Sequence, residues 1–532
     1  MSETPTSSSR LARAAGVAGA ATMASRVLGV VREQVLAAYF GAGNAMDAYN
    51  VAFRIPNLVR DLFAEGAMSA AFVPTFTRRL AAEGKDSAWR LSNTVITVLV
   101  IITGTLVIAG IAFAGPLVTA LAGDYAAVPG KLELTALLTR VMLPFLPLVA
   151  LAAVFMGMLN SLHRFFIPAL SPAMFNVGTI VCVLALVPLM PRIGWPPILA
   201  IAIGTLVGGF GQLAVQWPAL RREGFRFRPV VDLEDEGLRR VLVLMGPGTI
   251  GLAATQVNVF VNTVLAAGEG TGAVSWLNYA FRLMYLPIGL FGVSVATAAM
   301  PAVSRHAAQD DQAAIRRTVA DSLSLMMMLN VPATVGLVVL ATPIVQVIFE
   351  RRAFTHADTL ATAAALQFYA LGLVGYSVVR IVSPTFYAIN ESRTPVKVSV
   401  ISVLVNVALN IALVRVFGYR GLALGTSLAA LLNAGLLLVL LRRRLDGIED
   451  RRMLVSLGKI AAASTLMGAT AGGVDLVLLR WLPGPGLAAL VLRLLASIGV
   501  AIGVLAATAH LLNIDELRRA ARLVSSKLGR RP

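Results

Sequence analysis

The chain has 532 residues, of which 57% are hydrophobic and 14% are charged, and its mean hydropathy is +0.79. Soluble proteins average roughly 45–50% apolar and about 25% charged residues. The composition therefore excludes a soluble globular enzyme, a disordered protein and a disulfide scaffold.

Long unbroken apolar runs, such as residues 94–114, predict membrane-spanning helices, because the strands of a membrane barrel would alternate apolar and polar residues. The expected fold class is an all-α integral membrane protein with about 14 transmembrane helices. Their expected ranges are 14–40, 47–77, 92–121, 134–160, 168–190, 194–218, 240–266, 273–302, 318–349, 358–389, 395–416, 421–441, 454–479 and 486–512.

The N-terminal segment begins with a polar stretch, residues 2–9, and two arginines, Arg10 and Arg13. It resembles the start of a signal peptide. The apolar segment that follows contains Arg26, Arg32 and Glu33 and runs too long for one. We therefore expect residues 1–13 to form a cytoplasmic tail and the first helix to be retained.

Most of the 45 lysines and arginines lie in the N-terminal segment, in every second loop and in the C-terminal tail. Few basic residues, Lys131 among them, lie in the intervening loops. Basic loops stay in the cytoplasm, so this bias predicts that both termini are cytoplasmic. The net charge of +18 follows from these loops and predicts no nucleic-acid partner. The multi-pass protein is expected in the bacterial cytoplasmic (inner) membrane.

An internal repeat links two distant stretches of the chain. Residues 50–54 (NVAFR) match residues 278–282 (NYAFR), and Leu62-Phe63 matches Leu290-Phe291 at the same spacing. An even number of helices separates the copies, which predicts two parallel six-helix lobes related by a pseudo-twofold axis. The expected domains are a tail (1–13), an N-lobe (14–220), a basic cytoplasmic loop (221–239), a C-lobe (240–441), two further helices (442–512) and a basic amphipathic tail (513–532).

Eight arginines fall within the predicted spans, where a charge is costly unless it faces protein or water. Four of them, Arg26, Arg32, Arg54 and Arg60, lie in the first two helices, and Arg282 lies in the second copy of the repeat. Guanidinium groups bind phosphate through a planar fork of donors. We therefore expect these five residues to line a hydrated cavity and bind an anionic, phosphate-bearing substrate. Pairing of Arg32 with Glu33 or Asp47, and of Arg60 with Glu65, is the alternative.

Three acidic residues, Glu33, Asp47 and Glu65, accompany these arginines and are candidates for gating or for holding an arginine in place. The remaining intramembrane arginines, Arg140, Arg380 and Arg493, lie nearer predicted helix ends, where their side chains are expected to extend to the interface. The single cysteine, Cys182, and four scattered histidines provide no spacing for metal ligands. No metal and no cofactor are expected.

Several motifs resemble the MurJ (MviN) lipid II flippase family of the multidrug/oligosaccharidyl-lipid/polysaccharide exporter superfamily. The resemblance covers nearly the whole chain. The motifs are residues 25–29 (SRVLG), 40–43 (FGAG), 47–49 (DAY), 54–60 (RIPNLVR), 63–66 (FAEG), 71–74 (AFVP), 160–168 (NSLHRFFIP), 245–247 (MGP), 274–276 (VSW), 279–283 (YAFRL) and 394–397 (TPVK).

The resemblance implies a flippase that moves lipid II, an undecaprenyl-pyrophosphate disaccharide-pentapeptide, from the cytoplasmic to the outer leaflet by alternating access. It implies that Arg32, Arg60 and Arg282 engage the pyrophosphate, that Arg26 and Asp47 are important, and that the last two helices form a groove for the polyprenyl tail. Membrane lipids and cell-wall synthesis proteins are the further expected partners. Two residues, Phe281 and Asp61, depart from the family pattern, and ion coupling does not transfer.

Other classes fit the sequence less well. A related exporter of another polyprenyl-linked oligosaccharide, or of drugs, is the main alternative, although a drug exporter should have an acidic or aromatic cavity. A membrane enzyme would need acids or histidines in its outer loops, which are short and poor in both. A scaffold would not need buried arginines in both halves. The sequence therefore favours a transporter.

Overall fold

The computed structural model describes residues 7–60, 67–482, 484, 486–514 and 516, and within these ranges it contains helices and no β-strand. The prediction of an all-α fold is confirmed. The chain divides into two compact units, Met1–Ser275 and Trp276–Pro532. Glu65, Asp61 and most of the expected C-terminal tail lie outside the described residues.

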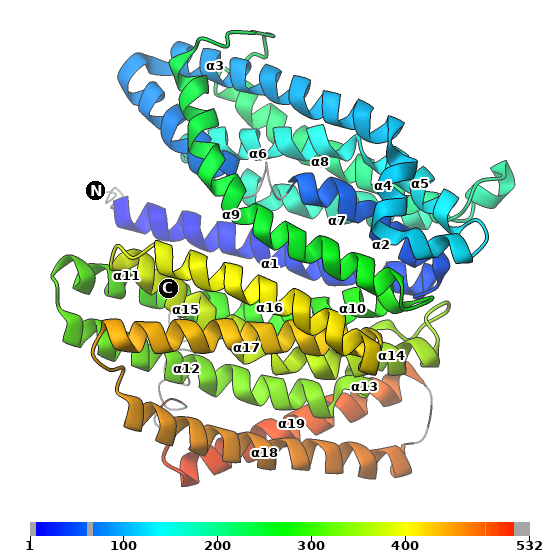
Figure 1. The fold of residues 1–532 in the computed structure, drawn as a ribbon, viewed down its shortest axis with the longest axis vertical. Helices are drawn as coiled ribbons and strands as arrows, with labels where there is room; N and C mark the ends of the chain where they lie inside the picture. The colour runs from blue at the N-terminus through cyan, green and yellow to red at the C-terminus, as the bar shows by residue number, and fades with distance from the viewer. Residues whose placement is uncertain (1–6, 61–66, 483, 485, 515, 517–532) are drawn as a thin grey trace, which may run out of the picture. The chain divides into compact units, whose positions relative to one another are not determined.

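Unit 1 is built from nine α-helices and two 3-10 helices within the described residues (Figure 1). They are α1 (Ser7–Phe40), α2 (Asn44–Arg60), α3 (Ala67–Ala112), α4 (Ala114–Ala122), η2 (Gly123–Ala127), α5 (Lys131–Met142), α6 (Phe145–Ser161), α7 (Phe166–Leu186), η3 (Met190–Ile193), α8 (Leu199–Arg222) and α9 (Glu236–Ala267).

Unit 2 contains the remaining helices, of which α10 begins just before the boundary between the units. They are α10 (Ala273–Pro287), the π-helix η4 (Ile288–Gly292), α11 (Val293–Ala308), α12 (Gln312–Val339), α13 (Ala341–Phe349), α14 (His356–Leu371), α15 (Leu373–Ala388), α16 (Arg393–Phe417), α17 (Tyr419–Arg444), α18 (Asp450–Trp481) and α19 (Leu487–Leu511).

Ten stretches within the described residues are long and apolar enough to cross a membrane. They correspond to ten of the expected spans; those near 14–40, 47–77, 240–266 and 273–302 are not among them. The number fourteen therefore stays a prediction. The expected connection at residues 78–91 is much shorter than predicted, because the two helical parts of α3 meet within it at a break at Gly84 (φ 84°, ψ −176°). Glycine tolerates this positive φ, and the flanking residues are good helix formers.

Close helix packing in unit 1 depends on small residues. α7 lies against α8, where a Cβ added at Gly178 would lie 2.6 Å from the backbone nitrogen of Gly208. Small residues let helix backbones approach closely where lipid gives no hydrophobic drive. A larger side chain at either glycine would therefore separate the two helices.

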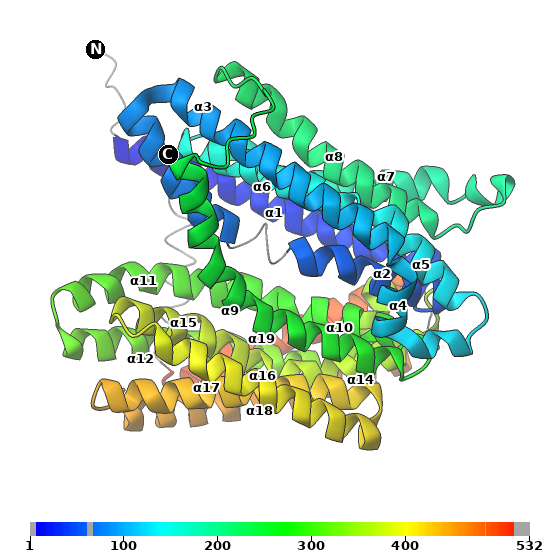
Figure 2. The same ribbon diagram turned by 45° about the horizontal axis from the view of Figure 1, so that its top comes forward.

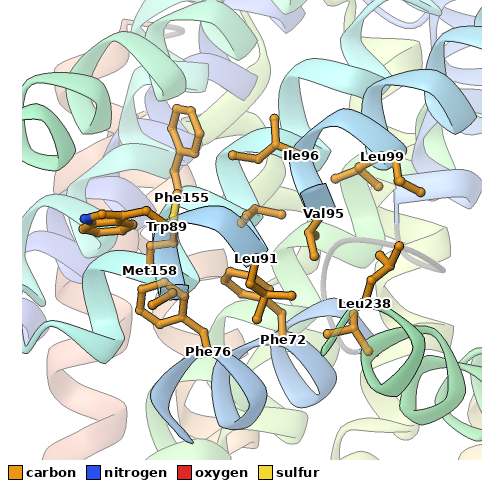
Figure 3. Close-up of a cluster of buried hydrophobic side chains, with 14 of the residues drawn as sticks. Phe72, Phe76, Trp89, Leu91, Val95, Ile96, Leu99, Phe155, Met158 and Leu238 are labelled. Atoms are coloured by element: carbon orange, nitrogen blue, oxygen red, sulfur yellow. The ribbon is translucent and has the colours of Figure 1, made fainter. Parts of the chain in front are cut away.

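An aromatic cluster holds the start of α3 against α6 and α9 (Figure 3). The ring centroids of Phe76 and Trp89 are 5.6 Å apart, and those of Trp89 and Phe225 are 5.2 Å apart. Leu238 of α9 belongs to the same cluster. α9 therefore packs on α3 and, at its other end, on α4, within unit 1 (Figure 2). The sequence placed this helix at the start of the second lobe.

The last two helices form a pair within unit 2. α18 and α19 lie side by side, α18 packs on α12, and α19 packs on α13 (Figure 1). Two small apolar clusters, which include Met328, Ile460, Met467 and Leu494, join them to the rest of the unit. Many of their other side chains are exposed, such as Leu476 and Leu495, as expected for helices that face lipid on one side.

Candidate substrate-binding site

Arg32 of α1 is buried and paired. Its guanidinium donates to the Glu33 carboxylate, with Nη2 at 2.5 Å and Nε at 3.2 Å from Oε1, and its Cζ lies 5.0 Å from the centroid of the Phe175 ring. The side chains are 9% and 7% exposed. Burial of an unpaired charge is unfavourable, so Glu33 neutralises Arg32. This is one of the two pairings that the sequence left open.

The other candidate arginines occupy more open positions. Arg26 on α1 is exposed, and Arg54 and Arg60 on α2 are partly buried. Arg282 is exposed on α10 in unit 2. Four of the five candidates thus lie on the first two helices of unit 1, and the fifth lies at the matching position of the repeat.

Asp47 of α2 lies at the centre of a polar cluster that includes Lys131 of α5 and residues 272–275, all within unit 1. Its carboxylate is fully buried and accepts hydrogen bonds from Lys131 Nζ (3.0 Å), the Gly272 amide (2.7 Å), the Ser275 amide (3.1 Å) and Ser275 Oγ (2.7 Å). The two amides precede and begin the first turn of α10, where backbone N–H groups lack helical partners. Asp47 therefore caps α10 from a different helix.

Lys131, which the sequence predicts in an outer loop just before the helix at 134–160, belongs to this cluster. It is 3% exposed at the first position of α5. Its Nζ lies 3.0 Å from Asp47 Oδ2 and 3.9 Å from the centroid of the Tyr125 ring. An ammonium can be buried when a carboxylate and an aromatic face replace its water. No local signal in the sequence indicates the contact with Asp47, which lies on another helix.

Further hydrogen bonds hold the α9–α10 connection against α2. The side chain of Asn50 donates to Ser275 Oγ (3.1 Å), and Thr271 Oγ1 donates to Asn44 Oδ1 (2.8 Å). Asn44, Asp47 and Asn50 follow each other at a spacing of three residues, which places them on one face of α2. This face fixes the segment through which unit 1 leads into unit 2.

In unit 2, the residue that precedes Arg282 lies in an aromatic cluster. Phe281 packs against Tyr285, Tyr369 and Tyr376, with ring centroids 5.4–6.5 Å apart. Arg380 of α15 donates to the hydroxyl of Tyr285 (2.7 Å). Phe281 therefore belongs to an aromatic cluster one residue from Arg282.

Arg493 corrects another expectation. It was expected to reach the interface, but it is 6% exposed and donates to Asp475 at 3.1 Å, so it joins α19 to α18. Arg140 is exposed on α5. Across the part of the chain that the structure describes, no three His, Cys, Asp or Glu residues are arranged to hold a metal ion.

At the opposite end of α9 lies a second charged network, which the sequence analysis missed. Arg79 of α3 donates to both carboxylate oxygens of Asp235 at 2.7 and 2.8 Å, and to Ser87 at 3.0 Å. Asp235 also accepts from the Leu238 amide and caps α9. Burial alone would raise the pKa of Asp235, but these hydrogen bonds and the charge of Arg79 hold it below its usual value.

The segment between α8 and α9 runs along α3, next to this charged network. Arg164 donates to Glu223 at 2.9 Å, and this hydrogen bond, with the nearby Lys85, lowers the pKa of Glu223. Asn93 and Thr97 accept from the amides of Arg228 and Val230 at 3.2 Å. Backbone groups of the segment are thus satisfied by side chains of α3. Part of the expected basic loop at residues 221–239 is therefore held against α3 by hydrogen bonds.

Comparison with known proteins gives consistent results. The family model described as "Lipid II flippase MurJ" matches residues 36–492. A probable lipid II flippase MurJ of Vibrio cholerae is 35% identical over 441 residues, covering 81% of this chain and 83% of that protein. The corresponding protein of Bdellovibrio bacteriovorus is 32% identical over 517 residues, covering 96% and 97%.

Solved structures with the same fold include a lipid II flippase MurJ in an inward closed conformation. Its TM-score is 0.75 at 26% identity, and the match covers 93% of this chain and 99% of that one. An inward-facing multidrug resistance MATE family transporter of the MOP superfamily matches with a TM-score of 0.69 at 16% identity, covering 82% and 98%. The second likeness shows the fold alone.

Proposed function

The chain belongs to the lipid II flippase MurJ family, and we propose that it translocates lipid II from the cytoplasmic to the outer leaflet of the bacterial inner membrane by alternating access. The observation that carries the proposal is the family match over residues 36–492, together with relatives of that name at 35% identity. The family is one of transporters, so this protein moves its substrate rather than transforming it.

We propose that Arg32, Arg60 and Arg282 bind the diphosphate of the cargo, with Arg26 and Arg54 supporting them. Two features support this assignment. Arg26 and Arg282 are exposed and Arg54 and Arg60 are partly buried, so a polar ligand can reach at least part of each side chain. The planar guanidinium fork matches phosphate oxygens. Arg32, paired with Glu33, would exchange its carboxylate partner for a phosphate or position its neighbours.

Asp47 fits a gating role. Its carboxylate joins α2 to the segment that precedes α10, and it is held by Lys131, which offsets its charge. A transporter that alternates access must break such contacts once per cycle. We propose that these hydrogen bonds close the outer side and separate when it opens. Glu33 and Glu65 remain the other acidic candidates of this site.

The last two helices, within residues 442–512, are proposed to accommodate the polyprenyl tail. Exposed apolar side chains along α18 and α19, such as Leu476 and Leu495, support this role. The distribution of basic residues supports cytoplasmic termini. The related proposal of a drug exporter has no comparable support, since the MATE likeness is 16% identical.

The proposal is tested by rescue of a bacterium depleted of its lipid II flippase. The wild-type chain should restore growth, whereas Arg32→Ala, Arg60→Ala and Arg282→Ala should not, although each protein still inserts. Lysine at the same positions should rescue partly, because it keeps the charge and loses the fork. Arg140→Ala, at an exposed arginine outside the proposed site, is the matched control and should rescue fully.

Native mass spectrometry gives an independent measurement. Purified wild-type protein should retain added lipid II, and the three alanine variants should retain less. Full rescue by all three variants would refute the diphosphate clamp. Retention of a cationic drug in place of lipid II would refute the choice of cargo.

A further inference from the structure

A basic cavity lies between the start of α3 and the start of α9, outside the site proposed above. Its volume is about 430 Å³, and its charged lining consists of Arg78, Arg79, Arg239, Arg240, Glu83 and Glu236. Both helices belong to unit 1. Basic residues predominate in the loops at this end of the unit, so the positive-inside rule places the cavity at the cytoplasmic surface.

Some of the charged side chains that line the cavity are paired with each other, and others have no partner within the described residues. Arg79 is saturated by Asp235, Ser87 and Glu83, and Glu83 is occupied in return. In contrast, the exposed side chains of Arg78, Arg239 and Arg240 make no hydrogen bond or ion pair with any residue that the structure describes. Glu236 is the one lining carboxylate not already engaged within the described chain. Three guanidinium groups thus face the cavity with a single acid to balance them.

The cavity is also held in a fixed shape. The bidentate Arg79–Asp235 pair fastens α9 to α3 on one side. Gly237 fits so closely that a Cβ there would lie 2.8 Å from Leu91 Cδ1 and 2.9 Å from Arg79 Nη1. Leu238 anchors the same turn in the aromatic cluster. The unpaired arginines are therefore presented from rigid helices, which reduces the entropy lost when they bind a ligand.

Beside the arginines, the surface becomes apolar within one turn of α9. Leu242, Val243 and Leu244 are 47%, 66% and 46% exposed, and Val243 lines the cavity itself. Three successive apolar residues cannot all face the interior of a helix packed on one side, so some of them face lipid. A ligand that spans both surfaces carries an anionic group next to an acyl chain.

We propose that this cavity binds the phosphate group of an anionic phospholipid from the cytoplasmic leaflet. Arg239 and Arg240 hold the phosphodiester with Arg78, and the acyl chains lie along Leu242, Val243 and Leu244. The guanidinium fork selects phosphate, and the net positive charge selects an anionic over a zwitterionic headgroup. This site is separate from the proposed cargo site and does not depend on transport.

The test compares two variants of the full-length protein that lose the same charge. Arg239→Ala/Arg240→Ala removes two cavity arginines. Arg221→Ala/Arg222→Ala removes two exposed arginines at the end of α8, which do not line the cavity. Native mass spectrometry measures retention of phosphatidylglycerol against phosphatidylethanolamine. We expect the first variant to lose about tenfold in phosphatidylglycerol retention and the second less than about twofold.

Three results would overturn the assignment. Equal losses in the two variants would indicate attraction by diffuse charge. Unchanged retention in Arg239→Ala/Arg240→Ala, and also after adding Arg78→Ala, would show that the cavity does not hold the lipid. A parallel experiment with inorganic phosphate distinguishes a lipid headgroup from a free anion. If phosphate protects residues 236–243 from hydrogen exchange and phosphatidylglycerol does not, the cavity binds a free anion. Thermal unfolding of every variant establishes that each is folded.

Discussion

The two ends of α9 each carry a charged cluster, and the clusters differ in how far water reaches them. At one end, Asp47 and Lys131 are 0% and 2% exposed at their side chains and interact at 3.0 Å. At the other end, Arg79 is 20% exposed beside Asp235, which is 4% exposed, and nearby at the end of α8 Glu223 is paired with Arg164, which is 65% exposed. The buried cluster has no solvent to replace a lost partner. Removal of one member should therefore cost far more there than at the exposed end.

The largest effect is expected from Lys131→Met, which keeps most of the side-chain volume and removes the charge. Asp47 would remain buried beside its amide and hydroxyl donors, with no cation to balance it. Breaking a buried pair from one side costs about 3–5 kcal/mol in the free energy of unfolding. Thermal unfolding of the detergent-solubilised protein, followed by tryptophan fluorescence, should show a large decrease in Tm.

A second variant separates stability from function at the same pair. Asp47→Asn with Lys131→Met removes both charges, so much of the lost stability should return. If Asp47 is the proposed gate, this double variant should still fail to rescue a flippase-depleted strain. A Lys131→Met protein as stable as wild type would contradict the comparison between the two ends.

The Asp47–Lys131 pair also shows which features of the structure can be predicted from the sequence and which cannot. The helical class and ten of the expected spans follow from long apolar runs, whose physical cause is local. The contact between Asp47 and Lys131 joins residues 84 positions apart, and neither periodicity nor capping encodes it. Arg493 was misplaced for the same reason, because its partner Asp475 lies on another helix.

Loop character is equally hard to infer from charge alone. Residues 78–91 look like a cytoplasmic loop because they contain Arg78, Arg79, Lys85 and Arg90. The residues on both sides of Gly84 are helical because the charged residues are good helix formers, and the chain turns at Gly84, where Trp89 of the second part of α3 packs against Phe76 of the first. The arginine set itself could be found, since a charge inside an apolar run is a local signal.

At the more exposed end, the largest effect should come from Gly237→Ala. The new methyl would lie 2.8 Å from Leu91 Cδ1 and 2.9 Å from both Arg79 Nη1 and Asp235 Oδ1. All three atoms are side-chain ends that can shift, so the cost should lie near the lower end of the about 1–3 kcal/mol that overpacking costs. The measurement is hydrogen exchange at the start of α9, which should accelerate. Gly435→Ala, where an added Cβ meets no atom within 4 Å, is the control and should not destabilise the protein.

The carboxylate of Asp235 predicts a smaller, pH-dependent effect. Its pKa is lower in the folded protein than the usual value of about 3.9 in an unfolded chain. Its stabilising contribution is therefore complete above that unfolded value and is lost as the pH falls through the folded pKa. Cleavage by pepsin between α8 and α9, at Phe227 or Leu233, should rise below about pH 4.

A matched variant shows whether Asp235 causes this change. Asp235→Asn still accepts a hydrogen bond at the start of α9 but cannot ionise. Its cleavage at Phe227 and Leu233 should already be fast at pH 5 and should change less on further acidification. An identical pH profile in both proteins would assign the acid sensitivity to other carboxylates.

The smallest effect should come from Glu223→Gln, which removes the charge that meets Arg164 at 2.9 Å and Lys85 at 3.4 Å. Both basic side chains are more than half exposed, so water replaces much of what is lost. Exposed pairs contribute about 0.2–1 kcal/mol. Salt screens these exposed ion pairs. Hydrogen exchange of the amides of residues 224–230 should therefore differ between variant and wild type in dilute salt. The two rates should converge near 1 M salt, where the Debye length is about 3 Å. A difference that persists at high salt would mean that Glu223 acts by packing rather than by charge, and the contrast between the two ends of α9 would then reflect shape as well as solvent.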